Sequence, residues 1–263
     1  MANTEYVGQK PPLGVGNIIS NALRLYFRNF IPFFVIALIP TLGYMGLFAG
    51  IGGRMNVVNG GSIEIAPRGF VVGVMLVTTI LSVIVMNIVT GMITLAALDK
   101  WQGRPMTYAR YFLMILQNIL PLTVLTVVAA LALMIGFLFF FIPGLYVSAM
   151  FFVLAPSVLV ERAGFGGLSR SIDLTREYRW PIIGTMIVMF LVLIVISILF
   201  AFVAGFFERA MSSEVLFWSA KGAELFGNTI GYGIAAVFVA MVYARLREIK
   251  EGLGVEDLSK VFA

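Results

Sequence analysis

The chain has 263 residues, of which 60% are hydrophobic and only 12% carry a charged side chain. Soluble domains have about twice that share of charged residues, so the composition excludes an ordinary water-soluble globule. The absence of cysteine and histidine excludes disulfides, His or Cys zinc sites, His- or Cys-ligated haem and a Ser-His-Asp triad. We therefore expect an all-α polytopic membrane protein that has no catalytic residues, no metal site and no cofactor, and that binds no nucleic acid.

Five runs of the sequence lack Asp, Glu, Lys and Arg and reach the roughly 20 apolar residues that a membrane crossing needs. The third run, 119–160, is long enough for two crossings and holds Pro143 and Gly144, which favour a chain reversal. A full hairpin and a re-entrant pair both fit this run. We count six crossings, at Phe30–Gly50, Phe70–Leu98, Ile119–Phe141, Leu145–Val160, Pro181–Phe207 and Leu225–Ala244.

The basic residues are divided unequally between the two sides that six crossings define. Of the 18 Lys and Arg residues, 14 lie in segments 1–29, 99–118, 161–180 and 245–263, which share one side. Basic residues concentrate in cytoplasmic loops, so both termini are expected in the cytoplasm. On the opposite side, the spacing of apolar residues over 208–224 predicts a short amphipathic helix on the outer leaflet.

An amphipathic stretch with a proline at its end precedes three of the predicted spans. These stretches lead into Pro32, Pro121 and Pro181, and proline is well tolerated in the first turn of a helix. We interpret the chain as one transmembrane domain over 1–263, with possible repeats at 14–98, 105–160 and 164–247. Each repeat would be a cytoplasmic amphipathic helix followed by a hairpin of two transmembrane helices.

Polar residues inside the spans are few and uncharged. Ser82, Asn87, Thr90 and Thr94 share one broad face of the second predicted span. Such a face could line a permeation path, but interhelical hydrogen bonding is the interpretation that we favour.

Glu161 ends the fourth predicted span and is followed by several arginines. A carboxylate beside guanidinium groups predicts an ion pair that holds the third amphipathic stretch in place. The alternative is that the basic groups bind anionic lipid headgroups. The candidate residues for either role are Glu161, Arg170, Arg176 and Arg179.

The stretch 142–181 resembles a bacterial family. The resemblance is carried by Pro143-Gly144, Pro156, Glu161, Gly166, Leu168-Ser169-Arg170-Ser171, Leu174-Thr175-Arg176 and Trp180-Pro181. These residues are similar to the membrane domain found in some glycerophosphoryl diester phosphodiesterases and in stand-alone six-helix proteins. The resemblance implies a membrane module and carries over no enzyme activity, because the hydrolytic domain of the fused proteins is a separate soluble domain with histidine ligands.

The sequence thus favours a non-catalytic integral protein of the bacterial inner membrane, acting as an accessory, scaffold or lipid-interacting module. Its expected partners are the phospholipid bilayer and other membrane proteins. The alternative function is a transporter or channel for lipid-like or small neutral solutes, lined by the Asn87 face. An enzyme would need a reactive serine or interfacial carboxylate that the sequence does not single out.

Overall fold

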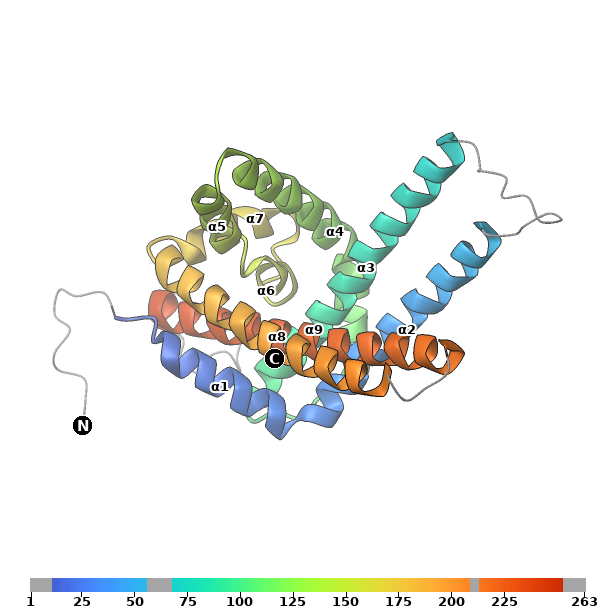
Figure 1. Cartoon of the computed structure of the whole chain (residues 1–263). Helices are drawn as coiled ribbons and strands as arrows, with labels where there is room; N and C mark the ends of the chain where they lie inside the picture. The colour runs from blue at the N-terminus through green and yellow to red at the C-terminus, as the bar shows by residue number, and fades with distance from the viewer. Residues whose placement is uncertain (1–10, 56–67, 209–212, 253–263) are drawn as a thin grey trace.

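The computed structural model describes residues 11–55, 68–208 and 213–252, and the regular elements in these ranges are all helices, which confirms the all-α prediction (Figure 1). Five helical stretches are long and apolar enough to cross a membrane, or six if the first two helices count as one bent span. The elements are α1 (Val15–Arg28), α2 (Phe30–Met55), α3 (Arg68–Trp101), α4 (Tyr108–Phe139), α5 (Phe141–Met150), α6 (Leu154–Leu159), the 3₁₀ turn η1 (Gly164–Gly166), α7 (Gly167–Thr175), α8 (Arg179–Glu208) and α9 (Ser213–Glu251).

The C-terminal half of α9 forms the centre of the molecule. The whole of α9 contacts α1, α2, α3, α6, α7 and α8, and most of its side chains between Ile234 and Leu246 are buried. A helix that is apolar on all sides is stable only when other elements surround it. The core therefore lies around this half of α9.

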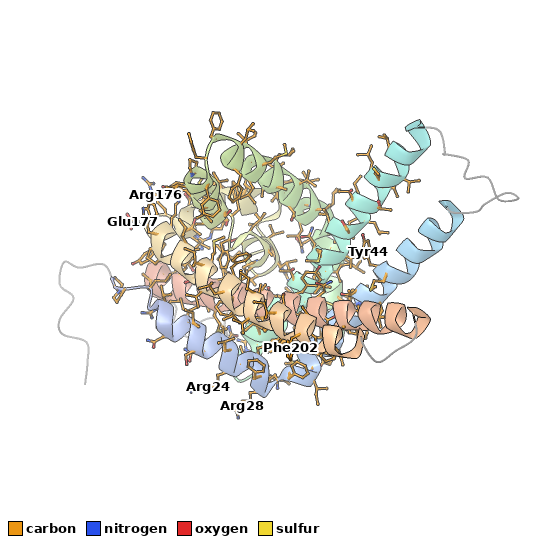
Figure 2. All side chains as sticks on the ribbon, in the orientation of Figure 1. Arg24, Arg28, Tyr44, Arg176, Glu177 and Phe202 are labelled. Carbon is orange, nitrogen blue, oxygen red and sulfur yellow. The ribbon has the colours of Figure 1, made fainter. Side chains whose placement is uncertain are left out.

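The paired helices diverge away from this centre. In Figure 1, α2 with α3 and α8 with α9 extend from it in different directions, and α4 extends in a third. Their outer parts expose large apolar side chains, which water would disfavour and hydrocarbon would not. Examples are Val72, Met75 and Leu76 on α3, Leu131, Met134 and Leu138 on α4, and Phe190, Leu191 and Phe202 on α8 (Figure 2).

The first and third amphipathic stretches form helices of their own. α1 meets α2 at an angle of 81°. At the bend, the Asn29 side-chain amide donates a hydrogen bond to the Leu25 carbonyl oxygen at 3.0 Å. α7 ends at Thr175, and the chain turns through Glu177, whose φ of 77° is in the left-handed region, before α8 begins. Pro32 and Pro181 then lie in the first turns of α2 and α8, as predicted.

The second amphipathic stretch does not form a separate helix, so this part of the repeat prediction is wrong. Residues 108–118 continue without a break into the apolar part of α4, with Pro121 inside the helix. Asn118 nevertheless makes the same local contact as Asn29, donating to the Met114 carbonyl oxygen at 2.9 Å. This local motif alone therefore does not bend the chain.

The prediction of a separate surface helix over 208–224 is also wrong where the structure describes it. Residues 213–224 are the first turns of α9, a single helix of 39 residues, and 209–212 lie outside the described residues. No proline interrupts α9, so the helix passes from the amphipathic stretch directly into the apolar one.

The reversal between α4 and α5 lies three residues earlier than expected. Phe140 has extended backbone angles, and Pro143 occupies the first turn of α5. Gly144 lies inside α5, where a Cβ would come within 2.3 Å of the Phe137 ring. Gly144 therefore permits close packing of α5 on α4 rather than a turn, and the return arm is divided into α5 and α6 by a break at residues 151–153.

Candidate functional site

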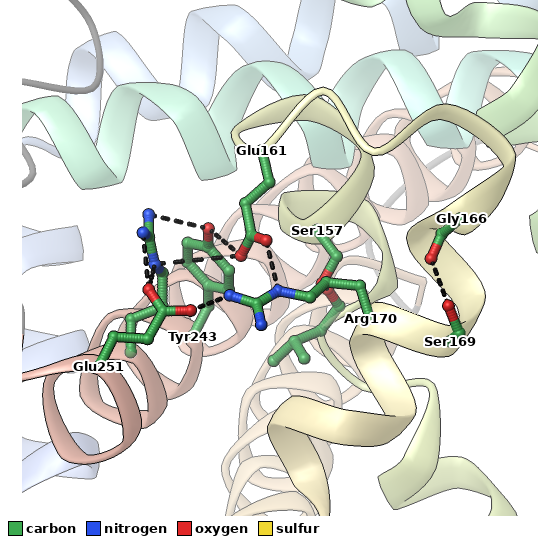
Figure 3. A network of polar contacts seen from close by, with 9 residues as sticks. Ser157, Glu161, Gly166, Ser169, Arg170, Tyr243 and Glu251 are labelled. Atoms are coloured by element: carbon green, nitrogen blue, oxygen red, sulfur yellow. Dashed lines mark hydrogen bonds and ion pairs between the residues drawn. The ribbon is translucent and has the colours of Figure 1, made fainter.

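A polar cluster lies between the α6–α7 connection and the end of α9. We call it the Glu161 cluster, and it consists of Glu161, Arg170, Tyr243, Arg247 and Glu251 (Figure 3).

Glu161 reaches the cluster from the residue after the C-cap of α6. The next residue, Arg162, has a φ of 52°, in the left-handed region that costs a non-glycine residue about 1–2 kcal/mol. This sharp turn lets the chain pass directly into η1 and α7. Arg170, on α7, then directs its Nε to Glu161 Oε2, so the structure brings these two predicted residues together.

The other three members come from one face of α9. Tyr243, Arg247 and Glu251 are spaced four residues apart, which places them in one row along the helix. The Tyr243 hydroxyl donates to Glu161 Oε1 at 2.9 Å, and Arg247 Nε donates to Glu251 Oε2 at 2.7 Å. Glu251 also accepts a hydrogen bond from Arg170 Nη2. Two carboxylates and two guanidinium groups therefore compensate one another.

The Glu161 cluster connects α7 to the central helix in a poorly solvated place. Arg247 is only 5% exposed and Tyr243 is fully buried. Burying a charge is strongly unfavourable unless it is paired and hydrogen-bonded, and in this cluster each charged group has an oppositely charged partner. The arrangement suits a structural connection, because both carboxylates are already engaged by guanidinium groups.

A smaller cluster of the same kind connects α3 to α4. The Tyr111 hydroxyl donates to Asp99 Oδ2 at 2.6 Å, and Arg104 lies 4.0 Å from the other oxygen of Asp99. Asp99 is 9% exposed. In both clusters a tyrosine hydroxyl on one helix donates a hydrogen bond to a largely buried carboxylate on another element.

Arg176 and Arg179 lie in the turn between α7 and α8, outside the Glu161 cluster. Arg176 is exposed at the edge of the molecule, beside Glu177 (Figure 2). Arg179 contacts Tyr146 of α5 instead of a carboxylate. Its Nη1 donates to the Tyr146 hydroxyl at 2.6 Å, and its guanidinium carbon lies 4.7 Å from the centre of the Tyr146 ring. The four candidate residues thus separate into an internal pair and two surface cations.

The four polar residues on α3 do not share one environment. Asn87 is 7% exposed and its Oδ1 accepts a hydrogen bond from Thr126 of α4 at 3.0 Å. Thr94 is fully buried, and Thr90 is half-buried. Ser82 lines a cavity of about 360 Å³ between α2, α3 and α9, whose lining includes none of the other three. Asn87 therefore lies at a contact between helices.

Two further hollows lie between the helices. A groove of about 630 Å³ between α2, α3 and the start of α4 is lined almost entirely by apolar side chains. A second, of about 420 Å³, separates α8 from α9 beside Asn228 and Tyr232. Within the described ranges, no group of three or more acidic residues has a geometry that could hold a metal ion.

Comparisons with known proteins found none that is similar to this chain. No family model, curated protein or solved structure matches it. The resemblance of 142–181 to the phosphodiesterase membrane domain therefore stays a prediction.

Sequence reasoning missed Tyr146, Tyr243, Arg247 and Glu251. The three residues on α9 form a polar row at spacing four that begins at the end of an uncharged run, and that pattern could have indicated a buried charged face. Their partner Glu161 lies about 80 residues earlier in the chain, and no local pattern indicates such a pairing. No sequence pattern distinguishes Tyr146 from other tyrosines, because tyrosine is common near a membrane surface.

Proposed function

We propose that the chain is a non-catalytic multi-pass protein of a bacterial inner membrane that acts as an accessory module by packing against lipids and other membrane proteins. The observation that carries this proposal is the division of its surface. Most basic residues lie in 1–29, 99–118, 161–180 and 245–263, and the Glu161 cluster compensates its own charges, while the outer parts of α3, α4 and α8 expose large apolar side chains.

In the proposed arrangement the chain crosses the bilayer six times in three hairpins. α1 and α7 lie along the cytoplasmic surface, and the first turns of α4 continue from that surface into the bilayer. The unequal distribution of basic residues supports cytoplasmic termini. The short α5 and α6 form the fourth crossing, because together they provide the 19-residue apolar segment Phe141–Leu159.

Transport along the Asn87 face has less support than the accessory role. A permeation path needs polar groups that face a continuous cavity, and Asn87 is bonded to Thr126 between two helices. The apolar groove beside α2 gives a lipid a place to lie and offers a polar solute few hydrogen-bonding partners.

Two measurements test the proposal. After extraction of membranes with alkaline carbonate, the tagged protein is expected to stay in the pellet, because apolar helices do not leave a bilayer when ionic contacts are removed. After purification in mild detergent at native expression, mass spectrometry should find reproducible partner chains or tightly bound lipids. Release by carbonate would contradict the membrane location. A lipid-free monomer with no reproducible partner would contradict the accessory role.

A further inference from the structure

Two cavities beside α9 share a polar boundary. One, of about 360 Å³, lies between α2, α3 and α9, and the other, of about 420 Å³, lies between α8 and α9, which run side by side (Figure 1). Asn228 and Tyr232 line both cavities, so the two approach each other at these side chains. The other polar residues of the two linings are Thr41, Tyr44, Ser82 and Ser197.

Asn228 and Tyr232 have hydrogen-bonding capacity that the protein leaves unused. Within the described ranges, no group forms a hydrogen bond with the Asn228 amide or the Tyr232 hydroxyl, and Asn228 is exposed although it belongs to the apolar segment Leu225–Glu251. An amide offers both donors and an acceptor. Because hydrocarbon supplies no partner for them, a ligand that does so is favoured at this position.

The polar residues of the four helices lie at one level in the proposed topology. Each is 15 to 18 residues from the polar or charged residue at the cytoplasmic end of its helix. This distance is about 22–27 Å along a helix, in a hydrocarbon core of about 30 Å. The cavities therefore lie in the outer third of the core, below the phosphate groups. The residue pairs are Asn29 and Tyr44 for α2, Asp99 and Ser82 for α3, Arg179 and Ser197 for α8, and Arg245 and Asn228 for α9.

The chemistry of the linings selects a neutral ligand. Among the described residues that line the two cavities none is charged, so a phosphate or carboxylate would be buried there without a cation. Amide and hydroxyl groups instead suit a hydroxyl or an ester carbonyl, with which they form neutral hydrogen bonds. The remaining lining residues are apolar, which suits a ligand with a small polar group and a long apolar body.

Small residues on α9 leave room for such an apolar body. Gly227 and Gly231 line the cavity that faces α8, and a Cβ added to either would still lie 3.7 Å from its nearest neighbour, Phe200 or Leu193. Both cavities fall within the range of roughly 300–1,000 Å³ that is typical of small-molecule sites. Two cavities that approach each other at one polar boundary match a lipid with one polar group and two acyl chains.

We propose that Asn228 and Tyr232 bind the hydroxyl and ester groups of a diacylglycerol, whose two acyl chains lie in the two cavities. The proposal rests on the membrane location proposed above and names the class of lipid that the protein would bind. A phospholipid is disfavoured, because its phosphate would have to leave the headgroup level for a place without cations.

The test is photo-crosslinking of reconstituted full-length protein. Diacylglycerol with a diazirine in one acyl chain, present as a minor component of phosphatidylcholine vesicles, is expected to label the cavity-lining residues of α8 and α9, as located by mass spectrometry. Unlabelled diacylglycerol should compete for this labelling. Phosphatidic acid with the same acyl chains should not compete, because it differs only in carrying a phosphate in place of the hydroxyl.

A first pair of variants examines the hydrogen bonds. Asn228→Leu keeps a similar volume and removes the amide, so half-maximal labelling should need about fivefold more diacylglycerol, the effect of one neutral hydrogen bond. Tyr232→Phe should act in the same direction. Thr79→Val is the control and should change nothing, since it removes an exposed hydroxyl from α3 that lines neither cavity.

A second pair examines the space for the acyl chain. Gly231→Leu places a side chain in the cavity between α8 and α9 and should abolish labelling there. Gly184→Leu is the matched control, because Gly184 lines neither cavity and a Cβ added to it would meet no atom within 4 Å. Circular dichroism and the thermal midpoint verify that each variant folds, and Gly231→Ala provides a smaller change if Gly231→Leu does not fold.

Several outcomes would overturn the site. Competition by phosphatidic acid as strong as that by diacylglycerol, labelling that persists in folded Asn228→Leu and Gly231→Leu, or an equal loss in the two controls would each do so. If Asn228→Leu abolishes a cross-linkable dimer and leaves lipid labelling unchanged, Asn228 pairs with a second copy of the chain and the lipid assignment is wrong. Retention of the protein in carbonate-washed membranes alongside any of these results would leave the proposed function standing without this site.

Discussion

At the scale of single residues, the Glu161 cluster is the feature most sensitive to substitution. Glu161→Gln removes the carboxylate that lies beside both Arg170 and Arg247, and Arg247 is almost fully buried. Removing one partner of a fully buried ion pair costs about 3–5 kcal/mol. We expect a loss of about 2 kcal/mol, because Arg170 retains Glu251 and is partly exposed.

The measurement is thermal unfolding in mild detergent, with Glu248→Gln as the control. Glu248 pairs with Arg245 on the same helix, and its side chain is 50% exposed, so its loss should change stability by no more than about 0.5 kcal/mol. Equal midpoints for the two variants would show that the Glu161 cluster does not stabilise the protein.

At the scale of elements, the docking of α1 on α9 depends on Gly233. A Cβ at this position would lie 2.6 Å from the Tyr26 ring, and Tyr26 is fully buried. Gly233→Ala should therefore destabilise the protein by about 1–3 kcal/mol, as overpacking does elsewhere. Gly184→Ala on α8 is the matched control, because a Cβ added there would meet no neighbouring side chain within 4 Å and alanine favours the helix.

Limited proteolysis at α1 gives a second readout for this contact. Gly233→Ala should make α1 more sensitive to cleavage, since Tyr26 no longer fits against α9, while Gly184→Ala should resemble the unaltered protein. Unchanged cleavage and an unchanged thermal midpoint in Gly233→Ala would mean that α1 is held by other contacts.

A comparison of the chain at Asn29 with the chain at Asn118 shows how far local sequence predicts this fold. The runs without charged residues predicted the positions of the long helices, because a helix that crosses the hydrocarbon core of a membrane must be long enough and apolar. Asn29 and Asn118 make equivalent contacts three residues before a proline, yet only the first site bends. The bend accompanies the packing of Tyr26 against Gly233, a contact between residues more than 200 positions apart that local pattern does not reveal.

The candidate site was predictable to a similar degree. The pairing of Glu161 with an arginine of the following stretch followed from their closeness in sequence, and the structure selects Arg170. The separate environment of Arg179 depends on α5 packing against α8, which places Tyr146 below the guanidinium. Such assignments need the tertiary arrangement, because the sequence alone showed one carboxylate followed by three candidate arginines and did not indicate which of them it pairs with.

At the scale of the whole molecule, the proposed topology predicts a pattern of chemical access. The chain has no cysteine, so single cysteines can be introduced without interference. Ser20→Cys and Ser169→Cys, both at exposed positions, should react with an impermeant maleimide only in inverted vesicles. Asn59→Cys should react only in intact spheroplasts, because segment 51–69 is expected outside the cytoplasm.

Asn87→Cys serves as the internal reference in the same experiment. Its position is 7% exposed and faces Thr126, so it should react from neither side until the protein is denatured. Reaction of Ser20→Cys from the outside would reverse the orientation. Reaction of Asn87→Cys in folded protein would restore the permeation path as a serious alternative.

The central place of α9 has a consequence for biogenesis. Ribosomes make a chain from its N-terminus, so the helix that contacts α1, α2, α3, α6, α7 and α8 emerges after all of them. Until then, the earlier helices lack the neighbour that buries their inner faces. Final assembly must therefore wait until α9 has been synthesised, and a nascent chain halted before α9 should be a substrate for membrane quality-control proteases.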